Sequence, residues 1–288
     1  MSPPDGPAGC LWIVATPIGT RDDLSPRARD VLAKVDVVMA EDTRRTGRLL
    51  SAMGIAGRGR LLSLHEHNEA RRVPQVLDRL AAGHDVALVS DAGTPVISDP
   101  GFELVREARG AGFRVLSVPG PSAFTAALAA AGQPPLPAML VGFLPARQGA
   151  RRRRVAELAA VSETVVVFLS PHRLKAELVD LAAGLGPKRP ATLLAELSKR
   201  HERAEVASLA GLANGREAGS PRGEYVLVIG PDESREDSPR DATTARDAYQ
   251  AALDRGLTRR EALRAAADEL GLPRRDLYDL LERDETDT

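Results

Sequence analysis

Cysteine, histidine and aromatic residues are all scarce in this chain. The single cysteine, Cys10, excludes an internal disulfide framework and fits a reducing cytoplasm. The five histidines show no metal-site spacing, and His65-Glu66-His67 is best interpreted as a loop pair bonded to solvent, so we expect no metal. An aromatic content of 3% argues against a platform that stacks the bases of single-stranded nucleic acid.

Several common targeting and nucleotide-binding signals are also missing. No apolar run approaches membrane-spanning length, and residues 1–9 lack the basic and apolar pattern of a signal peptide. We therefore expect a cytoplasmic protein that does not enter a membrane. Neither G-x-G-x-x-G nor G-x-x-x-x-G-K-[ST] occurs, which disfavours a classical dinucleotide or nucleoside triphosphate site.

Lysine is rare, whereas arginine is abundant. Only four of the 39 basic residues are lysines, and the net charge is −1. A polyanionic partner must therefore be met by a local patch rather than by the overall field. Arginine supplies planar, forked donors that suit phosphate groups.

The order of the predicted elements indicates an α/β protein with two α/β domains. In residues 10–133, five strands alternate with helices, which predicts a mainly parallel sheet. Three prolines within residues 132–137 mark a boundary, and residues 138–231 form the second predicted domain, with a helix expected over 206–213. We predict a disordered start (1–9), a charged linker (232–242) and three short helices in 243–288. These helices are either a helix-turn-helix-like module or a tail packed on the body of the protein.

One loop stands out between a predicted strand and a predicted helix. It reads Val89-Ser90-Asp91-Ala92-Gly93-Thr94-Pro95-Val96-Ile97-Ser98-Asp99-Pro100-Gly101. A rigid polar loop at the carboxyl end of a strand is where open α/β sheets bind ligands. The alternative is an ordinary turn, capped by Asp99 and with Pro100 at the first helical position. Similar small, polar loops follow Ala15 and Val118, and together they suit a neutral-to-cationic, adenosine-bearing ligand without a pyrophosphate.

Several ordered motifs resemble one known family. Leu11-Trp12-Ile13-Val14-Ala15-Thr16-Pro17-Ile18-Gly19 resembles the opening of the tetrapyrrole methylases, the class III S-adenosylmethionine methyltransferases. Six further motifs resemble the ribosomal small subunit methyltransferase I branch, in that family's order: 40–44 (AEDTR), 90–95 (SDAGTP), 119–123 (PGPSA), 142–145 (GFLP), 170–174 (SPHRL) and 196–199 (ELSK). The resemblance covers about residues 10–230, and the tail after 243 is also similar to that family's C-terminus.

The resemblance implies a fold, a reaction and a set of ligand contacts. The expected architecture is two α/β domains of the tetrapyrrole methylase type, with S-adenosyl-L-methionine folded into the cleft between them. The implied reaction is 2'-O-methylation of the ribose of the decoding-centre cytidine, position 1402, of 16S rRNA, catalysed by a homodimer. The cofactor-binding residues that it implies, the last three more weakly and by loop position, are Pro17, Asp91, Ala92, Gly93, Thr94, Pro95, Ser122, Ala123, Ile97, Leu169 and Leu197.

This chain departs from the family pattern at two positions. Thr20 stands where the family usually has Asn, and Leu169 stands where it usually has the Glu of Tyr-Glu-Ser-Pro. If that Glu were an essential base, activity would be impaired. We favour the interpretation that the Glu is structural and that Leu169 is tolerated.

Methyl transfer from a sulfonium needs alignment more than acid–base power, although a base helps because a ribose hydroxyl is a poor acid. Glu41 and Asp42 share a polar loop at a strand end and are the first candidates for the catalytic base. The structural alternative, which we favour, makes Asp42 the N-cap of the next helix and pairs Glu41 with Arg44. Lys199 and His172 are reserve candidates.

Cations near these motifs are the expected contacts to RNA phosphates. The candidates are Arg44, Arg45, Arg151, Arg152, Arg153, Arg154, Arg173 and Lys199. The run 151–154 is expected to open a helix, where cations oppose the helix dipole, which favours a binding role over a merely solvated helix start.

Two other functions remain open at this point. The same fold could act on another acceptor, a tetrapyrrole or a protein side chain, although the arginine clusters count against a tetrapyrrole. The loss of Glu at position 169 also leaves open a non-catalytic RNA-binding assembly factor.

Overall fold

The computed structural model describes residues 8–57, 59–215, 222–232 and 242–270, together with 272, 274, 277, 278 and 281. Two compact units are present, the first ending at Gly230 and the second beginning at Pro231. Most of the predicted disordered start, of the predicted linker and of the third helix expected in the tail lies outside the described residues.

The first sheet is entirely parallel, as the alternation of strands and helices predicts. Its strands lie in the order β3-β2-β4-β1-β5, and each neighbouring pair runs in the same direction. The bounds are β1 (Cys10–Val14), β2 (Val37–Ala40), β3 (Leu61–Ser63), β4 (Val86–Val89) and β5 (Arg114–Val118). The carboxyl ends of β1, β2, β4 and β5 therefore share one edge, where the conspicuous loops of the sequence emerge.

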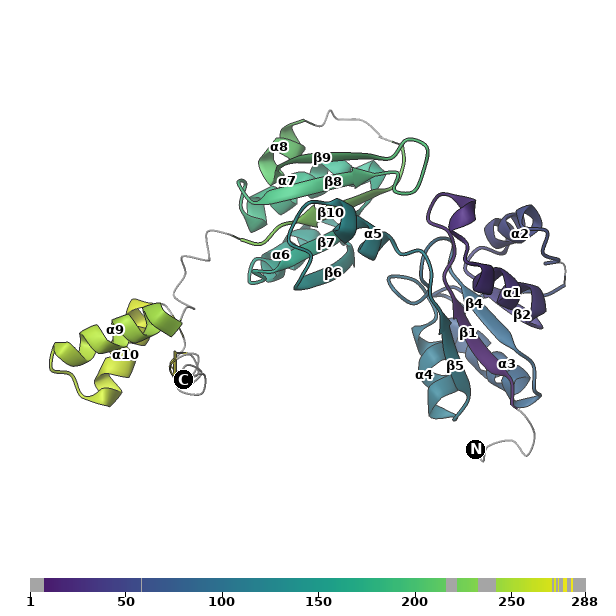
Figure 1. The fold of residues 1–288 in the computed structure, drawn as a ribbon, viewed down its shortest axis with the longest axis horizontal. Helices are drawn as coiled ribbons and strands as arrows, with labels where there is room; N and C mark the ends of the chain where they lie inside the picture. Colours follow the sequence, from purple (N-terminus) through teal and green to yellow (C-terminus); the bar gives the residue numbers. More distant parts are fainter. Residues whose placement is uncertain are drawn as a thin grey trace. The chain divides into compact units, whose positions relative to one another are not determined.

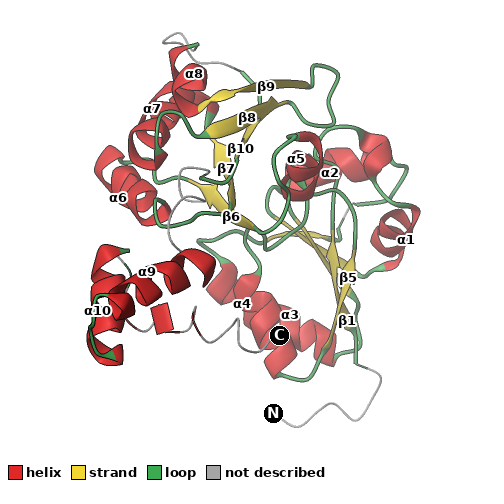
Figure 2. Cartoon of the chain, turned by 60° about the vertical axis from the view of Figure 1, so that its left-hand side comes forward, coloured by secondary structure: helices red, strands yellow, loops and turns green. Residues whose placement is uncertain are grey.

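Four helices cover the two faces of this sheet (Figures 1 and 2). They are α1 (Pro26–Lys34), α2 (Thr43–Ala52), α3 (Glu69–Ala81) and α4 (Phe102–Gly110), with a short 3-10 turn η1 (Arg21–Asp23) before α1. Alternate strand residues separate the two cores: Val38 and Val89 pack with α1 and α2, whereas Met39 and Leu88 pack with α3 and α4. This alternation follows from the two-residue period of a strand.

The second sheet is mixed. Its order is β6-β7-β10-β8-β9, in which only β6 and β7 are parallel. Its elements are β6 (Ala138–Phe143), α6 (Gln148–Leu158), β7 (Thr164–Leu169), η2 (Pro171–Arg173), α7 (Leu174–Leu185), β8 (Pro190–Ala195), β9 (Arg203–Ser208), α8 (Leu209–Asn214) and β10 (Tyr225–Ile229). Helices α6, α7 and α8 cover one face, with Leu178, Leu181 and Leu212 buried there.

The prediction of a helix over residues 206–213 is wrong for residues 206–208. Residues 203–208 form β9, which pairs antiparallel along its length with β8, and the helix α8 begins only at Leu209. The Ala and Glu residues of this segment carry little strand propensity, and Val206 is 70% exposed. Pairing with a free sheet edge therefore outweighs the local preference.

Helix α5 (Ala123–Ala130) precedes the proline-rich boundary yet packs on the second sheet. Ala127 and Ala131 lie in one buried cluster with Val166, Val226 and Val228, on the face opposite α6 and α7. Figure 1 shows α5 beside β10. Its small side chains allow close approach, so a segment predicted to belong to the first domain completes the core of the second.

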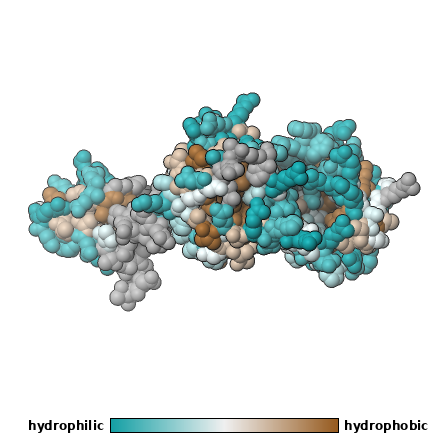
Figure 3. Space-filling view, turned by 90° about the horizontal axis from the view of Figure 1, so that it is seen from above, coloured by the Kyte–Doolittle hydropathy of each residue, from teal (hydrophilic) through white to brown (hydrophobic). Residues whose placement is uncertain are grey.

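The second unit contains α9 (Ala242–Asp254) and α10 (Arg259–Glu269). A capping box begins α10, as the sequence predicts, and the backbone N–H of Thr258 donates to the Glu261 carboxylate over 3.0 Å. The second unit has its own buried cluster, which includes the small residues Ala245, Ala266 and Ala267. None of the helices that the structure describes is long and apolar enough to cross a membrane. In the space-filling view of Figure 3, apolar side chains form separate patches within a mostly hydrophilic surface.

Candidate active site

A cavity of about 330 Å³ lies at the carboxyl ends of the first sheet's strands and against the second sheet. Loops following β2, β4 and β5 form one side, and residues from β6, β7, α5 and β10 form the other. The residues that line it are Ile18, Glu41, Arg45, Asp91, Ala92, Gly93, Thr94, Ile97, Ser98, Asp99, Ser122, Ala123, Phe124, Phe143, Phe168, Leu169, Pro171, Glu224, Tyr225 and Val226. This is the edge at which open α/β sheets bind ligands.

Hydrogen bonds fix the loops to one another. Thr16 and Gly93 exchange two backbone bonds of 2.8 and 2.9 Å, and the Thr16 hydroxyl donates to the Ser90 carbonyl over 3.2 Å. The Thr94 hydroxyl donates to the Pro121 carbonyl over 3.1 Å, which ties the loop after β4 to the loop after β5. Backbone groups freed at the strand ends are therefore satisfied, and the cavity wall is preorganised.

The central loop contains unusual backbone conformations. Gly93, Val96 and Ser98 have φ values of 82°, 77° and 67°, and such a value is a genuine outlier for a β-branched residue like Val96. Gly101 has φ 121°, and a Cβ there would lie 2.5 Å from Leu88 Cδ2. Conformations of this kind persist only where the surrounding structure holds them, and they gather at functional sites.

The alternative interpretation of this loop as a simple capped turn is wrong. Helix α4 begins at Phe102, its N-cap is Gly101, and no side chain caps it. Neither Asp99 nor Pro100 occupies the position that the capped-turn interpretation assigns to it. Asp99 lines the cavity instead.

Three carboxyl groups meet at the polar end of the cavity: Glu41, Asp91 and Asp99. Burial, the Glu41 charge and the Asp91 charge raise the pKa of Asp99 to about 6, although a hydrogen bond from the Ser90 side chain opposes the shift. Burial and the Asp91 charge also raise the pKa of Glu41. A group with a pKa near neutrality, set in a cavity, is suited to accepting a proton.

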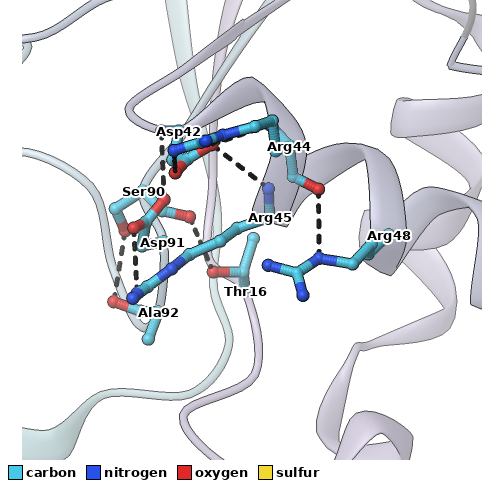
Figure 4. Close-up of polar contacts among 8 residues, drawn as sticks. All are labelled: Thr16, Asp42, Arg44, Arg45, Arg48, Ser90, Asp91 and Ala92. Carbon is cyan, nitrogen blue, oxygen red and sulfur yellow. Dashed lines mark hydrogen bonds and ion pairs between the residues drawn. The ribbon is translucent and has the colours of Figure 1, made fainter.

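Asp42 has a structural task, as the favoured alternative predicts. Its Oδ1 accepts hydrogen bonds from the backbone N–H groups of Arg44 and Arg45 at the start of α2, over 2.8 and 3.4 Å. The side chain of Arg44 also bonds to it, and this contact lowers the pKa of Asp42 to about 2 (Figure 4). Arg44 therefore pairs with Asp42 and not with Glu41.

Arg45 joins the two loops that carry the carboxylates. Its Nη1 lies 3.1 Å from Asp91 Oδ2, while Asp91 Oδ1 accepts the backbone N–H of Asp42 over 3.1 Å (Figure 4). Because 60% of the Arg45 side chain is exposed, it can also meet a partner in solution.

Most of the sequence-predicted cofactor residues lie together in the cavity wall. The structure brings together Asp91, Ala92, Gly93, Thr94, Ile97, Ser122, Ala123 and Leu169. Pro17, Pro95 and Leu197 are not in the wall. Pro95 and Leu197 are buried, and Leu197 packs in the core beneath α5.

Sequence reasoning missed several cavity residues, above all Asp99, Phe124, Phe143, Phe168 and Tyr225. Asp99 was within the conspicuous loop, but its position before Pro100 suggested a helix cap. Phe143 and Phe168 lie in or beside recognised motifs and carried no signal of their own, because only folding brings β6 and β7 beside the central loop.

Both departures from the family pattern have a local explanation. The Thr20 hydroxyl donates to the Ser198 carbonyl over 2.6 Å, and the Ser198 hydroxyl donates to Asp23, so Thr20 joins the loop after β1 to the loop after β8. Leu169 is 1% exposed and packs in the core of the second sheet. An apolar side chain therefore fits this position.

The four arginines of the 151–154 run have different environments. Helix α6 begins at Gln148, three residues before the run. The prediction that the run opens the helix, where its cations would oppose the helix dipole, is therefore wrong. Arg151 is 3% exposed and, with Arg152, binds the buried Asp180 over 2.7 and 2.8 Å. Arg153 is exposed, and Arg154 pairs with Glu157. Arg151 is thus enclosed and leaves the set of RNA candidates.

Two other cationic candidates hold loops beside the cavity. Arg173 pairs with the buried Glu177, whose other oxygen accepts the backbone N–H of Ser170 over 2.9 Å. Lys199 Nζ lies 3.0 Å from Glu196 and 2.9 Å from Glu224; burial alone would lower the Lys199 pKa, but these carboxylates raise it. Within the part of the chain that the structure describes, no group of three or more His, Cys, Asp or Glu is arranged to hold a metal ion.

Comparison with known proteins supplies the family. A family model described as Tetrapyrrole (Corrin/Porphyrin) Methylases matches residues 10–213. Ribosomal RNA small subunit methyltransferase I of Xylella fastidiosa (strain Temecula1) is 43% identical over 272 residues, which cover 94% of this chain and 98% of the relative. The chain belongs to the ribosomal RNA small subunit methyltransferase I family.

Other members and solved structures agree with this assignment. The small subunit methyltransferase I of Escherichia coli O157:H7 is 41% identical, with 95% of each chain covered. A diphthine synthase shares the fold with a TM-score of 0.61 at 16% identity, over 77% of this chain and 90% of that one. Uroporphyrin-III C-methyl transferase from Thermus thermophilus, solved with S-adenosyl homocysteine, gives a TM-score of 0.55 at 22% identity, over 77% and 97%. These structures confirm the tetrapyrrole methylase fold that the resemblance implies.

Proposed function

We propose that this protein is a methyltransferase that uses S-adenosyl-L-methionine to methylate the ribose 2'-hydroxyl of the decoding-centre cytidine, position 1402, of 16S rRNA. The observation that carries the proposal is the set of fixed loops and raised-pKa carboxyl groups around one cavity, in a chain whose relatives of matching length are named ribosomal RNA small subunit methyltransferase I. The proposal includes a cytoplasmic homodimer that acts on the assembled 30S subunit.

The cavity fits the proposed cofactor in size and chemistry. A volume of about 330 Å³ is within the usual range for small-molecule sites. Asp91, Glu41 and Asp99 supply negative charge for a ligand that carries a sulfonium and an ammonium group. Ala92, Thr94 and Ser122 present small side chains and hydroxyls along the wall, and Arg45, the basic residue of the wall, is paired with Asp91. When bound, the cofactor would supply an electrophilic methyl group on its positively charged sulfur.

We propose Asp99 as the proton acceptor, with Glu41 as the neighbour that tunes it. A bound cofactor would supply the methyl group to the ribose oxygen and keep the bonding electrons on its sulfur, and the Asp99 carboxylate would take the hydroxyl proton. A pKa of about 6 leaves Asp99 mostly ionised at neutral pH while keeping its basicity near the optimum. Glu41 stays a candidate for direct contact, whereas Asp42, already bonded to Arg44 and Arg45, is a poor base.

Alignment is the other requirement of an in-line methyl transfer, and the fixed loops support it. The Thr16–Gly93 bridge and the Thr94–Pro121 bond hold two walls of the cavity, and the Glu177–Ser170 bond holds the loop after β7. Arg44, Arg45 and Arg153 are exposed, and their guanidinium groups are the proposed contacts to RNA phosphates.

Two alternatives predict different outcomes. A protein with another acceptor would bind the cofactor but leave rRNA unmodified. A non-catalytic assembly factor need not bind the cofactor at all. The buried, well-packed Leu169 supports the enzyme over the second alternative, since an apolar residue fits that position without loss of packing.

The decisive experiment uses 30S particles from cells that lack their own enzyme of this family. The purified protein is incubated with them and with methyl-labelled S-adenosylmethionine, and alkaline hydrolysis of the rRNA then locates any 2'-O-methyl group, which blocks cleavage at that linkage. We expect label and a missing cleavage at the decoding-centre cytidine. Cofactor binding without label in the RNA would overturn the proposed acceptor, and no cofactor binding would overturn the enzyme assignment. The Asp99→Asn protein serves as the matched control.

A further inference from the structure

Four of the nine aromatic residues of this protein line the cavity. The chain has five phenylalanines, three tyrosines and one tryptophan. The four that line the cavity are Phe124, Phe143, Phe168 and Tyr225. The low aromatic content predicted no stacking surface, yet the fold brings the rings of Phe124, Phe143 and Phe168, from α5, β6 and β7, to one place. The Tyr225 side chain is 3% exposed and packs in the core on the other face of the sheet.

Phe143 is the ring best placed to meet a ligand. It is 61% exposed, and its ring centroid lies 5.6 Å from that of Phe168 at an interplanar angle of 60°. Leaving so large an apolar side chain in solvent forgoes stabilisation that burial would provide. Phe168 supports the ring from one side, so the other side is available.

A β-bulge sets the direction of Phe143. The register between β6 and β7 shifts between Leu140 and Gly142, and Gly142 has φ 74°. A Cβ on Gly142 would lie 2.8 Å from Ser98 Oγ. Bulges re-aim side chains beside active sites. Here the bulge also brings Phe143 beside the loop that carries Asp99, one residue after Ser98.

We propose that Phe143, backed by Phe168, is the stacking platform for the nucleobase of an RNA nucleotide that has been turned out of its helix. This inference rests on the proposed function and names the part of the site that holds the acceptor. The cavity wall is partly exposed, with Ile97 and Phe143 open to solvent, so a single nucleotide can enter it once it leaves the helix stack. Enzymes that take a nucleotide out of the stack hold the displaced base against aromatic side chains.

The distribution of charge around the cavity agrees with this placement. The base would lie at the aromatic end, and its ribose would point along the bulge toward Asp99 and Glu41. Arg45, with 60% of its side chain exposed, stands on the polar side for the adjoining phosphate. A stacking contact tolerates any base, so the platform holds the nucleotide while contacts elsewhere select it.

The test compares Phe143→Ala with Phe102→Ala. Phe102 is a matched control because it is 59% exposed, lies outside the cavity wall and instead stands beneath the Arg106 guanidinium. At saturating cofactor, we expect Phe143→Ala to lower kcat/KM for 30S particles by about 10-fold or more, mainly through KM, as the loss of one base stack would. Phe143→Tyr keeps an aromatic ring and should keep the rate of the unmodified protein, whereas Phe143→Leu should lower the rate as Phe143→Ala does. Phe102→Ala should match the unmodified protein.

A second measurement reports the displaced base directly. 30S particles are reconstituted with 16S rRNA that carries pyrrolocytidine at the target position, and its fluorescence rises when the base leaves the helix stack. The unmodified protein should produce this rise at saturation, and Phe143→Ala should reduce it. Far-UV circular dichroism checks that each variant is folded.

Three results would overturn the inference while leaving the proposed function intact. Unchanged kcat/KM and fluorescence in Phe143→Ala would show that no base stacks there. A larger dissociation constant of Phe143→Ala for S-adenosylmethionine, measured by calorimetry, would assign the ring to the cofactor's adenine. A change in oligomeric state by light scattering would assign it to a contact between copies. If the unmodified protein transfers no methyl group to RNA, the proposed function itself fails.

Discussion

The two carboxylates beside β2 show how one peptide bond separates a residue that caps a helix from one that lines the cavity. Asp42 faces the first turn of α2, where backbone N–H groups and Arg44 hold its pKa near 2. Glu41 points to the cavity, where burial and Asp91 raise its pKa. Sequence spacing located the pair but could not say which side chain points where, because that depends on the first helical residue.

Asp99→Asn should nearly abolish methyl transfer, with kcat lower by about 100-fold or more, since a general base typically contributes that much. In the unmodified protein, kcat/KM should rise with pH to a plateau above the Asp99 pKa of about 6. A pH–rate profile measures this rise, which forms the acidic limb of the profile. An Asp99→Asn protein that keeps the limb and the rate would exclude Asp99 as the base.

Glu41→Gln separates tuning from proton transfer. Because the Glu41 charge helps to raise the Asp99 pKa, removing it should move the acidic limb of the profile to lower pH while the plateau falls less than in Asp99→Asn. Asp42→Asn is the matched control, since asparagine also caps helices, and it should leave the limb in place. A limb that does not move in Glu41→Gln would contradict this coupling.

The same Asp99 pKa affects stability. A carboxyl whose folded pKa is raised binds its proton more tightly in the folded state, so the folded protein loses stability as pH rises from 3.8 to about 6. Asp99→Asn should therefore stabilise the protein at pH 7 by about 1 kcal/mol, a value reduced for the partial exposure of the group, and the gain should vanish below pH 4. Urea unfolding at pH 7 and pH 4 measures the difference.

At the level of elements, the connection between β4 and α4 is the part that the sequence predicted only in outline. The strand ends at Val89 and the helix begins at Phe102, at the two ends of the conspicuous loop in the sequence. The sequence did not predict Gly101 as the N-cap of α4. The backbone of Gly101 lies close to the Leu88 side chain, and that contact is invisible in the sequence. The same limit applies to β9, where an available edge of β8 overrides the local helix propensity.

Gly101→Ala tests the close approach. A Cβ would lie 2.5 Å from Leu88 Cδ2 at a φ of 121°, so we expect a loss of about 2–3 kcal/mol in the free energy of unfolding. Gly110→Ala, in the same helix with nothing within 4 Å of the added atom, should instead be neutral or gain up to about 1 kcal/mol. Equal effects in urea unfolding would show that the approach is not a constraint.

The arginine run of α6 should separate into structural and surface residues. Arg151→Ala leaves the buried Asp180 with Arg152 alone and should cost about 2–3 kcal/mol in unfolding free energy. Arg153→Ala should leave stability unchanged and, if this residue contacts phosphate, lower the salt dependence of RNA binding by about one unit of slope. Binding titrations at several salt concentrations, together with urea unfolding, distinguish the two.

For the whole molecule, the sequence predicted the class, the parallel first sheet and the family, because each follows from local pattern or from motif order. It did not predict the convergence of Phe143, Phe168 and Asp99, which come from two sheets and meet only after folding. Functional contacts between distant segments leave no periodic trace, whereas strands and helices do.

The two compact units should be separable. Each has its own buried cluster, and residues 10–213 alone match the family model. A chain ending at Gly230 should therefore keep the thermal midpoint of the unit that holds the cavity and should still bind S-adenosylmethionine. Differential scanning calorimetry of both chains checks this, and a midpoint lower by more than a few degrees would show that the second unit stabilises the first.

Helix α5 has a consequence for anyone who wishes to divide the protein into two complementing fragments. The natural choice from the sequence is the proline-rich segment at 132–137, but a cut there leaves α5 on the first fragment and its apolar partners, Val166, Val226 and Val228, on the second. Both fragments would then expose apolar surfaces that lack their packing partners, and they would aggregate before they reassociate. A cut in the loop before α5, near Gly120, would keep that helix with the sheet it covers.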